Sequence, residues 1–273
     1  MYVQNETQEQ RLDQTNWFNT PFDHVVFNES KTIPTTIFVQ ENLGAGNVKD
    51  TGFEQQMIAV EDTLEDYGVN IEWQVNDRLK LTLDAHTGES EAKGGLPGGR
   101  TGVAFSMGAP VITAHSADFS GGVPIQNIVI DDVARGNGNG VLDAGDLGSQ
   151  VAREVSNSQK QELDQVTFDG EWEFTDNSRV QFGIDYIETE TASSSFQTQL
   201  TLGNWGIENP GDIPTDLVDT FCLVCQFDDF SLPATGDSEV AFQANAVELL
   251  DVLGPEYGEP APTADTNDLI EEE

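Results

Sequence analysis

The sequence predicts an all-β fold in which antiparallel strands run up and down and form part of a transmembrane β-barrel with long extracellular loops. Three observations predict it. Several segments alternate apolar and polar residues with a period of two, and the connections between them are either very short or very long. The apolar faces also carry no charge over about nine residues, close to the length that a tilted strand needs to cross a bilayer.

The alternation is clear in four segments and weaker in a fifth. We expect strands at about residues 64–75, 79–90, 162–174 and 179–190, with the weaker one at about residues 2–13. Tight turns join the four clear segments into two hairpins, and each presents one apolar face. The residues of these faces are Tyr67, Val69, Ile71, Trp73, Val75, Leu79, Leu81, Leu83, Ala85, Val166, Phe168, Gly170, Trp172, Phe174, Val180, Phe182, Ile184 and Tyr186.

The remaining segments are rich in Gly, Pro, Asn, Asp and Ser, and we expect long loops at about residues 14–62, 91–160 and 192–273. Loops of this length are uncommon in compact soluble domains. If the strands run up and down, both tight turns fall at one end of the sheet and all the long loops at the other. That asymmetry is typical of outer-membrane barrels.

A soluble β-sandwich is the alternative, because its strands also alternate apolar and polar residues. In that case the chain is a secreted acidic module that binds carbohydrate or calcium. The two interpretations differ in what covers the apolar face, which is lipid in a barrel and a second sheet in a sandwich. Leu81, Phe168 and Phe182 are the residues whose exposure separates them.

The charge balance limits the partners. Eleven Lys and Arg residues face 49 Asp and Glu residues, so the formal net charge is −38. A surface this acidic repels nucleic acid. No run of about 18 apolar residues predicts a transmembrane helix, and the first residues have neither the basic nor the apolar region of a signal peptide.

Three strings carry a resemblance to a known family. They are NDRLKLTLDAH at residues 76–86, DQVTFDG at residues 164–170 and GNWGIENPGD at residues 203–212. They resemble the barrel region of TonB-dependent receptors, and the likeness covers about residues 11–265. The resemblance implies a large barrel of about 22 strands with an N-terminal plug inside it.

The resemblance also implies a function and a set of partners. The expected function is active uptake of a scarce nutrient, such as a carbohydrate or a siderophore, across the bacterial outer membrane. The partners are outer-membrane lipid, the small-molecule nutrient, and the TonB complex acting through the plug. The sequence contains no plug-like region, no TonB box and no terminal strand that ends in an aromatic residue. We therefore expect this chain to be a piece of such a receptor.

Residues 137–146 resemble an EF-hand-type calcium loop, and calcium is the one cofactor that the sequence suggests. Arg135 occupies the first position of the loop, where the motif has a carboxylate, so the ligand set is one short. The alternative is an Asn-Gly-rich turn that needs positive φ angles. The candidate ligands are Asn137, Asn139, Val141 through its carbonyl, Asp143 and Asp146.

The two cysteines, Cys222 and Cys225, form a lone CxxC motif in the last long loop. We expect a disulfide there, because that loop faces an oxidising exterior in the barrel interpretation. Free thiols and half of a metal or redox site are the alternatives. Residues 240–250 have helical spacing, and we expect a short helix in the same loop.

No constellation of side chains predicts catalysis. The three histidines, His24, His86 and His115, are scattered along the chain and form no Ser/His/Asp or paired-histidine motif. The carboxylates are so numerous that chance pairs are unavoidable, so none of them indicates acid–base chemistry. We therefore expect a protein that is not an enzyme.

Overall fold

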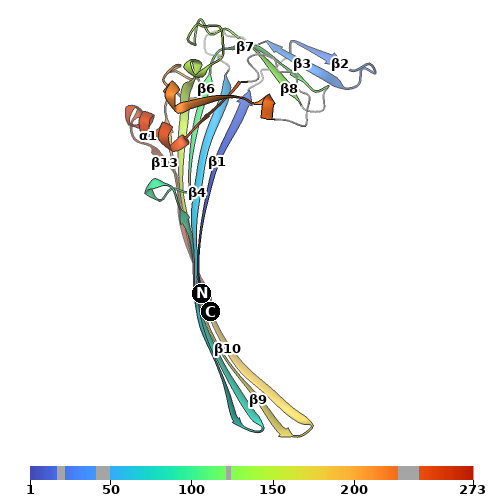
Figure 1. Cartoon of the computed structure of the whole chain (residues 1–273), viewed down its shortest axis with the longest axis vertical. Helices are drawn as coiled ribbons and strands as arrows, with labels where there is room; N and C mark the ends of the chain where they lie inside the picture. Colours follow the sequence, from blue (N-terminus) through green and yellow to red (C-terminus); the bar gives the residue numbers. More distant parts are fainter. Residues whose placement is uncertain (17–21, 41–49, 121–123, 227–239, 273) are drawn as a thin grey trace.

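The structure is a computed structural model, and it describes all residues except 17–21, 41–49, 121–123, 227–239 and 273. Most of the chain forms one long, twisted antiparallel sheet, with strand order β1-β4-β5-β9-β10-β13 and with β6 between β4 and β9 (Figure 1). Its strands are β1 (Tyr2–Asn16), β4 (Thr51–Asn76), β5 (Leu79–Gly94), β6 (Gly102–Ala109), β9 (Gly148–Thr175), β10 (Ser178–Thr201) and β13 (Ala261–Glu272).

Strands β5 and β6 lie in line and together act as one interrupted strand. Gly94 at the end of β5 is opposite Val60 of β4, and Gly102 at the start of β6 is opposite Ile58. The segment between them, which contains the 3-10 helix η1 (Pro97–Gly99), leaves the sheet as a small loop. Gly94 permits this loop, because a Cβ there would overlap the carbonyl oxygen of Gly99.

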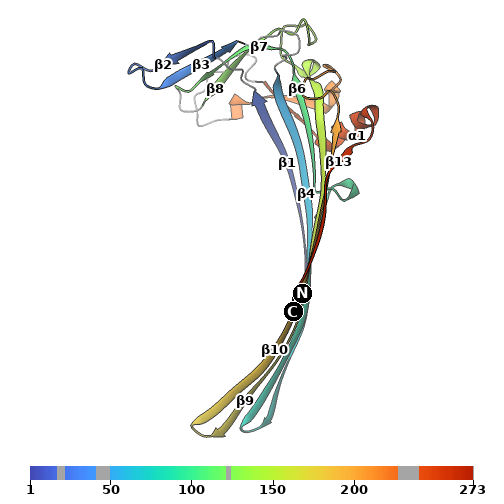
Figure 2. The same cartoon turned by 180° about the vertical axis from the view of Figure 1, so that it is seen from behind.

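The far end of the molecule carries two smaller sheets and one helix. Figures 1 and 2 agree that the four-stranded sheet β2-β3-β7-β8 lies on the concave side of the main sheet and that helix α1 lies on the convex side. The elements here are β2 (His24–Phe27), β3 (Pro34–Gln40), β7 (Ile112–Asp118), β8 (Ile125–Ile130), β11 (Val218–Cys222), β12 (Val240–Ala244), α1 (Ala246–Tyr257), η2 (Ala144–Asp146), η3 (Thr215–Leu217) and η4 (Val224–Gln226).

The buried core lies at this end, where β12 and α1 pack on the convex face of the main sheet. The rings of Phe53 on β4 and Phe242 on β12 meet edge to face, with centroids 5.0 Å apart. Gln55 lies in the same contact and satisfies the backbone there: its amide donates to Phe242 O at 2.9 Å and its Oε1 accepts from Ala244 N at 2.9 Å. The core therefore attaches the last loop to the sheet.

The predicted strand order is confirmed, since the four clear segments are β4, β5, β9 and β10 as consecutive antiparallel neighbours. The expected bounds were too short, because β4 begins at Thr51 and β9 begins at Gly148. The expected loops at residues 14–62, 91–160 and 192–273 are correspondingly wrong in extent. Each of them contains strands that pair with the main sheet or with each other.

The helix expected at residues 240–250 is half right. Val240–Ala244 is strand β12, paired with β11, and α1 begins only at Ala246. Asn245 caps the helix, since its side-chain oxygen accepts from the backbone N–H groups of Val247 and Glu248. The capping residue marks the change from strand to helix that apolar spacing alone did not predict.

Candidate functional site

Below the level of the chain termini, β4, β5, β9 and β10 form a sheet with two chemically different faces. The register aligns apolar residues in rows across all four strands. Ile71 is opposite Leu83, Leu83 is opposite Phe168, and Phe168 is opposite Ile184. Because every pairing keeps this alternation, the apolar side chains of four strands form one continuous surface.

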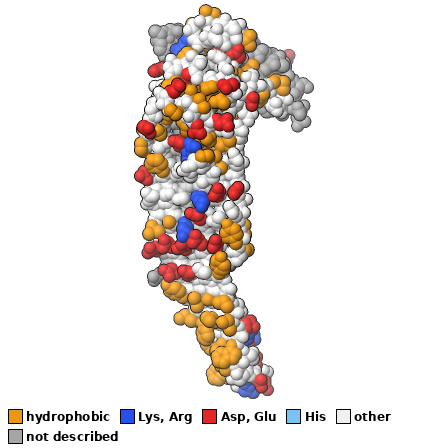
Figure 3. All heavy atoms as spheres, turned by 60° about the vertical axis from the view of Figure 1, so that its left-hand side comes forward, with side chains coloured by type: hydrophobic (Ala, Val, Ile, Leu, Met, Phe, Trp, Pro, Cys, Tyr) orange, Lys and Arg blue, Asp and Glu red, His pale blue; other side chains and the backbone are white. Residues whose placement is uncertain are grey.

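This apolar face is exposed. Ile184 is 71% exposed, Phe182 47% and Phe168 37%, and Leu81 is half-buried. Figure 3 shows the surface as a hydrophobic patch at the lower end of the molecule. Soluble monomers rarely expose apolar patches larger than a few hundred Å². A sandwich would bury these side chains, and in the described part of the chain nothing covers them.

Two aromatic details stabilise the apolar face locally. The ring of Phe182 lies over Gly170, its neighbour across the strands, where a Cβ would overlap the ring. This arrangement shields the glycine backbone with an aromatic side chain. Close to the tight turn, the rings of Trp172 and Phe174 lie 6.0 Å apart. Aromatic residues are typical of the two boundaries of a membrane-spanning surface.

A row of carboxylates bounds the apolar face on the side of the long loops. The five residues occupy equivalent positions on five neighbouring strands, from β4 to β13. Figure 3 shows an acidic band directly above the hydrophobic patch. Because like charges directly opposite each other repel, this row destabilises strand pairing. Its members are Glu65, Glu89, Glu162, Glu190 and Glu271.

Lys160 relieves part of this repulsion. Its ammonium group contacts Glu162 at 2.5 Å and Glu89 at 3.2 Å. Hydrogen bonds to Glu162 and then to Glu89 raise the pKa of Lys160 above its usual value. The carboxylate row and the position of this lysine could not be predicted from the sequence, because a row of charges across strands is recognisable only when the register between the strands is known.

The charge-free part of this apolar face, the apolar band, has nearly the height of a membrane-spanning surface. From Tyr67 to Val75 there are eight steps along β4, which corresponds to about 26 Å at about 3.3 Å per residue. A tilt of about 40° leaves about 20 Å, against the typical 25 Å. The carboxylate row lies immediately above this band, and the polar turn at residues 77–78 lies below it.

The opposite face of the same four strands is polar, and its side chains bond to one another across strands. Asn70 donates to Asp84 at 2.8 Å, and Thr167 donates to Asp185 at 2.5 Å. The ion pair between Lys80 and Glu72 measures 3.0 Å. Such a face is compatible with water and unsuited to lipid.

The proposed calcium loop is closed by its own hydrogen bonds. The amide groups of Asn137 and Asn139 donate to the two oxygens of Asp143 at 2.8 and 2.6 Å. Asp146 accepts from the backbone N–H groups of Asn137 and Asp143 at 2.9 and 3.0 Å. Val141 is exposed and its N–H donates to Asn139 at 2.8 Å. The five candidate ligands are thus adjacent, in the geometry of hydrogen-bonded Asn turns.

Two further residues define this loop. Arg135, at the first position of the motif, points away and donates to the carbonyl oxygen of Ile207 at 2.7 Å. Asp132, which lies before the motif in the sequence, is buried and accepts from Gly140 N at 2.7 Å. Burial raises the pKa of Asp146, and the nearby charges of Asp143 and Asp132 add to this effect, against backbone hydrogen bonds that lower it.

No cluster of three or more His, Cys, Asp or Glu side chains among the described residues has an arrangement that could hold a metal ion. Three of the five candidate ligands are not of these residue types, because Asn137 and Asn139 would bind through amide oxygens and Val141 through its carbonyl. Calcium binding by residues 137–146 therefore stays a prediction, to be tested in solution.

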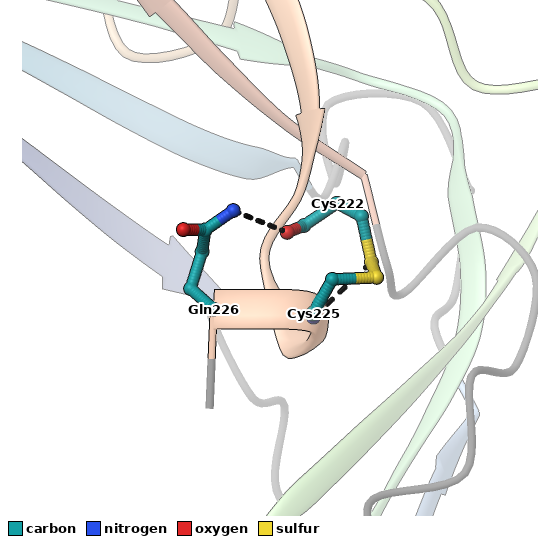
Figure 4. The surroundings of a disulfide bond; sticks show 3 residues. All are labelled: Cys222, Cys225 and Gln226. Atoms are coloured by element: carbon teal, nitrogen blue, oxygen red, sulfur yellow. Dashed lines mark hydrogen bonds between the residues drawn. A yellow bond between two sulfur atoms is a disulfide. The ribbon is translucent and has the colours of Figure 1, made fainter. Parts of the chain in front are cut away.

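The two cysteines are bonded in the structure, with their Cα atoms 5.3 Å apart (Figure 4). Cys222 ends β11, and Cys225 lies in η4. The backbone N–H of Cys225 donates to the sulfur of Cys222 at 3.2 Å, and the Gln226 amide donates to the Cys222 carbonyl at 3.4 Å. The bridge closes one short turn and lies away from the apolar face.

Comparisons with known proteins do not assign the chain to a family. No protein-family model, curated protein or solved structure matches the chain. Among the described residues, the structure also contains no helix that is both long and apolar enough to pass through a membrane. The two-faced sheet is therefore the feature of the molecule that bears on its function.

Proposed function

We propose that this chain is part of an outer-membrane β-barrel of the TonB-dependent receptor type, which takes up a scarce nutrient. The exposed apolar face of β4, β5, β9 and β10 carries the proposal. It is continuous across four strands and free of charge, and it ends at a row of five glutamates. A lipid bilayer would cover this surface and remove it from water.

The barrel interpretation requires further strands at both edges of the lower sheet. Residues 67–76 of β4 and 178–188 of β10 each pair with a strand on one side only, within the described residues. In a bilayer each unpaired backbone group costs several kcal/mol. A closed barrel removes both edges, which is why we propose a part of a larger receptor rather than an independent module.

The polar concave face would then line the lumen. In the complete receptor, the plug would block this lumen and connect it to the TonB complex, which supplies the energy for uptake. A carbohydrate, a siderophore or a similar small molecule would enter from the end that carries the small sheets. The carboxylate row would lie at the outer boundary of the bilayer.

The test uses tryptophan fluorescence in lipid vesicles that contain brominated acyl chains, which quench only tryptophans within the bilayer. The protein-to-lipid ratio is kept high, so that copies of the chain can pair their open strand edges with one another. Two single-tryptophan versions of the full chain are compared, one retaining Trp172 and one retaining Trp205. Trp172 lies on the apolar band and is 52% exposed, whereas Trp205 lies at the far end and is 57% exposed. We expect strong quenching of Trp172 and none of Trp205.

Because both tryptophans are similarly exposed, the comparison separates insertion from nonspecific contact with lipid. Equal quenching of both residues would indicate adsorption of an unfolded chain. A folded chain that remains in the aqueous phase with Trp172 unquenched would overturn the barrel proposal and favour the secreted acidic module.

A further inference from the structure

A shallow groove runs along the concave face at mid-height, above the level of the apolar band. It consists of three depressions of about 370, 450 and 370 Å³ that share walls. Ala92 and Gln159 line both the depression beside Leu64 and the middle depression of about 450 Å³. Ile58 and Asn157 line both the middle depression and the one beside Gln56. The three therefore form one elongated feature parallel to the strands.

Small residues form the floor of the groove. On the concave side, β5 presents Ser90, Ala92 and Gly94, and β6 continues this line with Gly102 and Ala104. The strands on both sides carry larger side chains, so the line of small residues is a depression between them. The interruption between β5 and β6 preserves the line, because β6 resumes the same path beside β4.

Along two of the three depressions, one wall of the groove consists of uncharged hydrogen-bonding side chains on two adjacent strands. In the remaining depression, β9 contributes Arg153 and Glu154. Amides on β9 are opposite hydroxyls on β10, in register: Gln161 with Thr191, Gln159 with Ser193, and Asn157 with Ser195. At the same height, the convex face carries the carboxylate row and Lys160. In a chain with a net charge of −38, this wall is a local exception.

The hydrogen-bonding groups of this wall are available. The side chains of the three amides and three hydroxyls make no hydrogen bond to another side chain of the described residues, and they are exposed or half-buried. Lower on the same face the polar side chains are used internally, as in the pairs Asn70–Asp84 and Gln181–Glu171. The groove wall is therefore a surface with unused donors and acceptors.

The other wall, on β4, is mainly apolar. Ile58, Val60 and Leu64 point to the concave side, with Asp62 between them. Glu54, in an ion pair with Arg153 of β9, lies at the upper end of this wall. An amide wall facing an apolar wall suits a ligand that has hydroxyl groups on one side and C–H groups on the other. Asn and Gln amides both donate and accept, as hydroxyl groups do.

We propose that this groove binds an uncharged, hydroxyl-rich chain, a neutral oligosaccharide. The inference rests on the proposed uptake function and names the class of nutrient that the concave face would take. Three features carry it: the elongated shape, the absence of charge from the amide and hydroxyl wall, and the unused hydrogen-bonding groups. An anionic ligand would meet Asp62 and the strongly negative field of the whole chain.

The binding test uses the full chain in lipid vesicles and isothermal titration calorimetry. The probes are three neutral hexasaccharides (maltohexaose, cellohexaose and xylohexaose), an anionic oligogalacturonate, and an uncharged Gly-Ser-Asn peptide of similar length. We expect at least one neutral hexasaccharide to bind and the oligogalacturonate not to bind. The substitution Gln159→Glu should weaken that binding about tenfold by adding a charge to the wall and removing a donor.

Gln4→Glu is the matched control, because it makes the same substitution on the convex face of the edge strand β1 and should leave binding unchanged. Binding of the peptide in preference to all hexasaccharides would overturn the proposal and indicate that a polypeptide segment occupies the groove. No binding by a chain that has inserted into vesicles would overturn the groove proposal while leaving the barrel proposal intact. Hexasaccharide binding by a chain that stays in water would do the reverse.

Discussion

On one face of strand β4, two stretches with the same apolar alternation lie in opposite surroundings. Phe53 and Met57, near the start of the strand, are buried under β12 and α1, whereas Val69 and Ile71, near its end, are more than half exposed. Both stretches belong to one unbroken strand, so the backbone does not distinguish them. Alternation in sequence predicts that a face avoids water, but it does not predict whether protein or lipid covers the face.

The largest expected effect comes from truncating the covered stretch. Phe53→Ala removes a ring that is 1% exposed and packs against Phe242, and it should destabilise the upper core by about 3–5 kcal/mol. Ile71→Ala, on the same face of the same strand, should leave that core unchanged. Urea titration followed by limited proteolysis of α1 measures both variants. Equal loss of α1 protection in the two would remove the distinction between the regions.

Introducing a charge should have its effect in the exposed region. Ile184→Arg places a cation in the middle of the apolar band, where arginine facing lipid costs about 2–4 kcal/mol. We expect a lower fraction of the chain to fold into vesicles, measured by protection from protease. Thr82→Arg, on the polar face and opposite Glu72 and Asp169, is the control and should fold normally. Normal insertion of Ile184→Arg would contradict lipid contact at this face.

The third prediction concerns the end of α1. The Tyr257 hydroxyl donates to Asp212 at 2.5 Å and accepts from Asn209 at 2.7 Å. Burial, followed by the bond to Asp212, raises the pKa of Tyr257 above 10.0. Tyr257→Phe should reduce the stability of the upper core by about 1–2 kcal/mol at neutral pH.

The pH dependence provides a second measurement on the same residue. Because the folded pKa of Tyr257 is raised, the unfolded chain loses this proton first, and the stability that the hydroxyl contributes falls as pH rises above about 10. The difference in urea midpoint between the parent chain and Tyr257→Phe should therefore shrink as pH is raised from about 8 to about 11. A constant difference across this range would show that deprotonation of this hydroxyl is not involved.

A smaller effect is expected at residues 137–146. If calcium binds, it should do so weakly, with a dissociation constant of about 10⁻⁴–10⁻³ M, as in extracellular modules. Millimolar calcium should then slow proteolysis of the loop in the parent chain, and Asp143→Ala should abolish that protection. Absence of protection in the parent chain would leave the observed hydrogen bonds as the whole explanation of the loop.

The disulfide is expected to have the least effect on either region, since it closes a short turn between Cys222 and Cys225. Thiol labelling of the denatured, unreduced chain should find no free cysteine. Reduction should leave insertion of the lower sheet unchanged, because the bridge lies at the other end of the molecule. Two labelled thiols before reduction would show that the bridge does not form in the isolated protein.

Strand segments with one apolar and one polar face were predicted from the sequence. Segments with two polar faces were not. Residues 67–75 alternate apolar with polar, and that part of β4 was predicted closely. Directly above, Glu61, Asp62, Thr63 and Glu65 give both faces a polar character, yet the strand continues because β1 and β5 hydrogen-bond to it. The composition of a segment does not reveal pairing partners that are distant in the chain.

The same limit applied to the candidate sites. The two cysteines and the residues of the Asn-Gly loop were identifiable because they are close in sequence. The groove and the carboxylate row consist of residues from three to five strands, brought together by register alone. Gln161 and Thr191 are thirty positions apart in sequence but directly opposite each other in the sheet, and no local pattern predicts that pairing.

The row of five glutamates has a consequence for how the sheet assembles. Neighbouring strands lie about 4.8 Å apart, so these carboxylates repel strongly in dilute buffer, where the screening length is about 30 Å at 0.01 M salt. At 1 M salt that length falls to about 3 Å, shorter than the spacing between strands. We therefore expect the strands to come together more readily at this level in about 1 M salt than in dilute buffer.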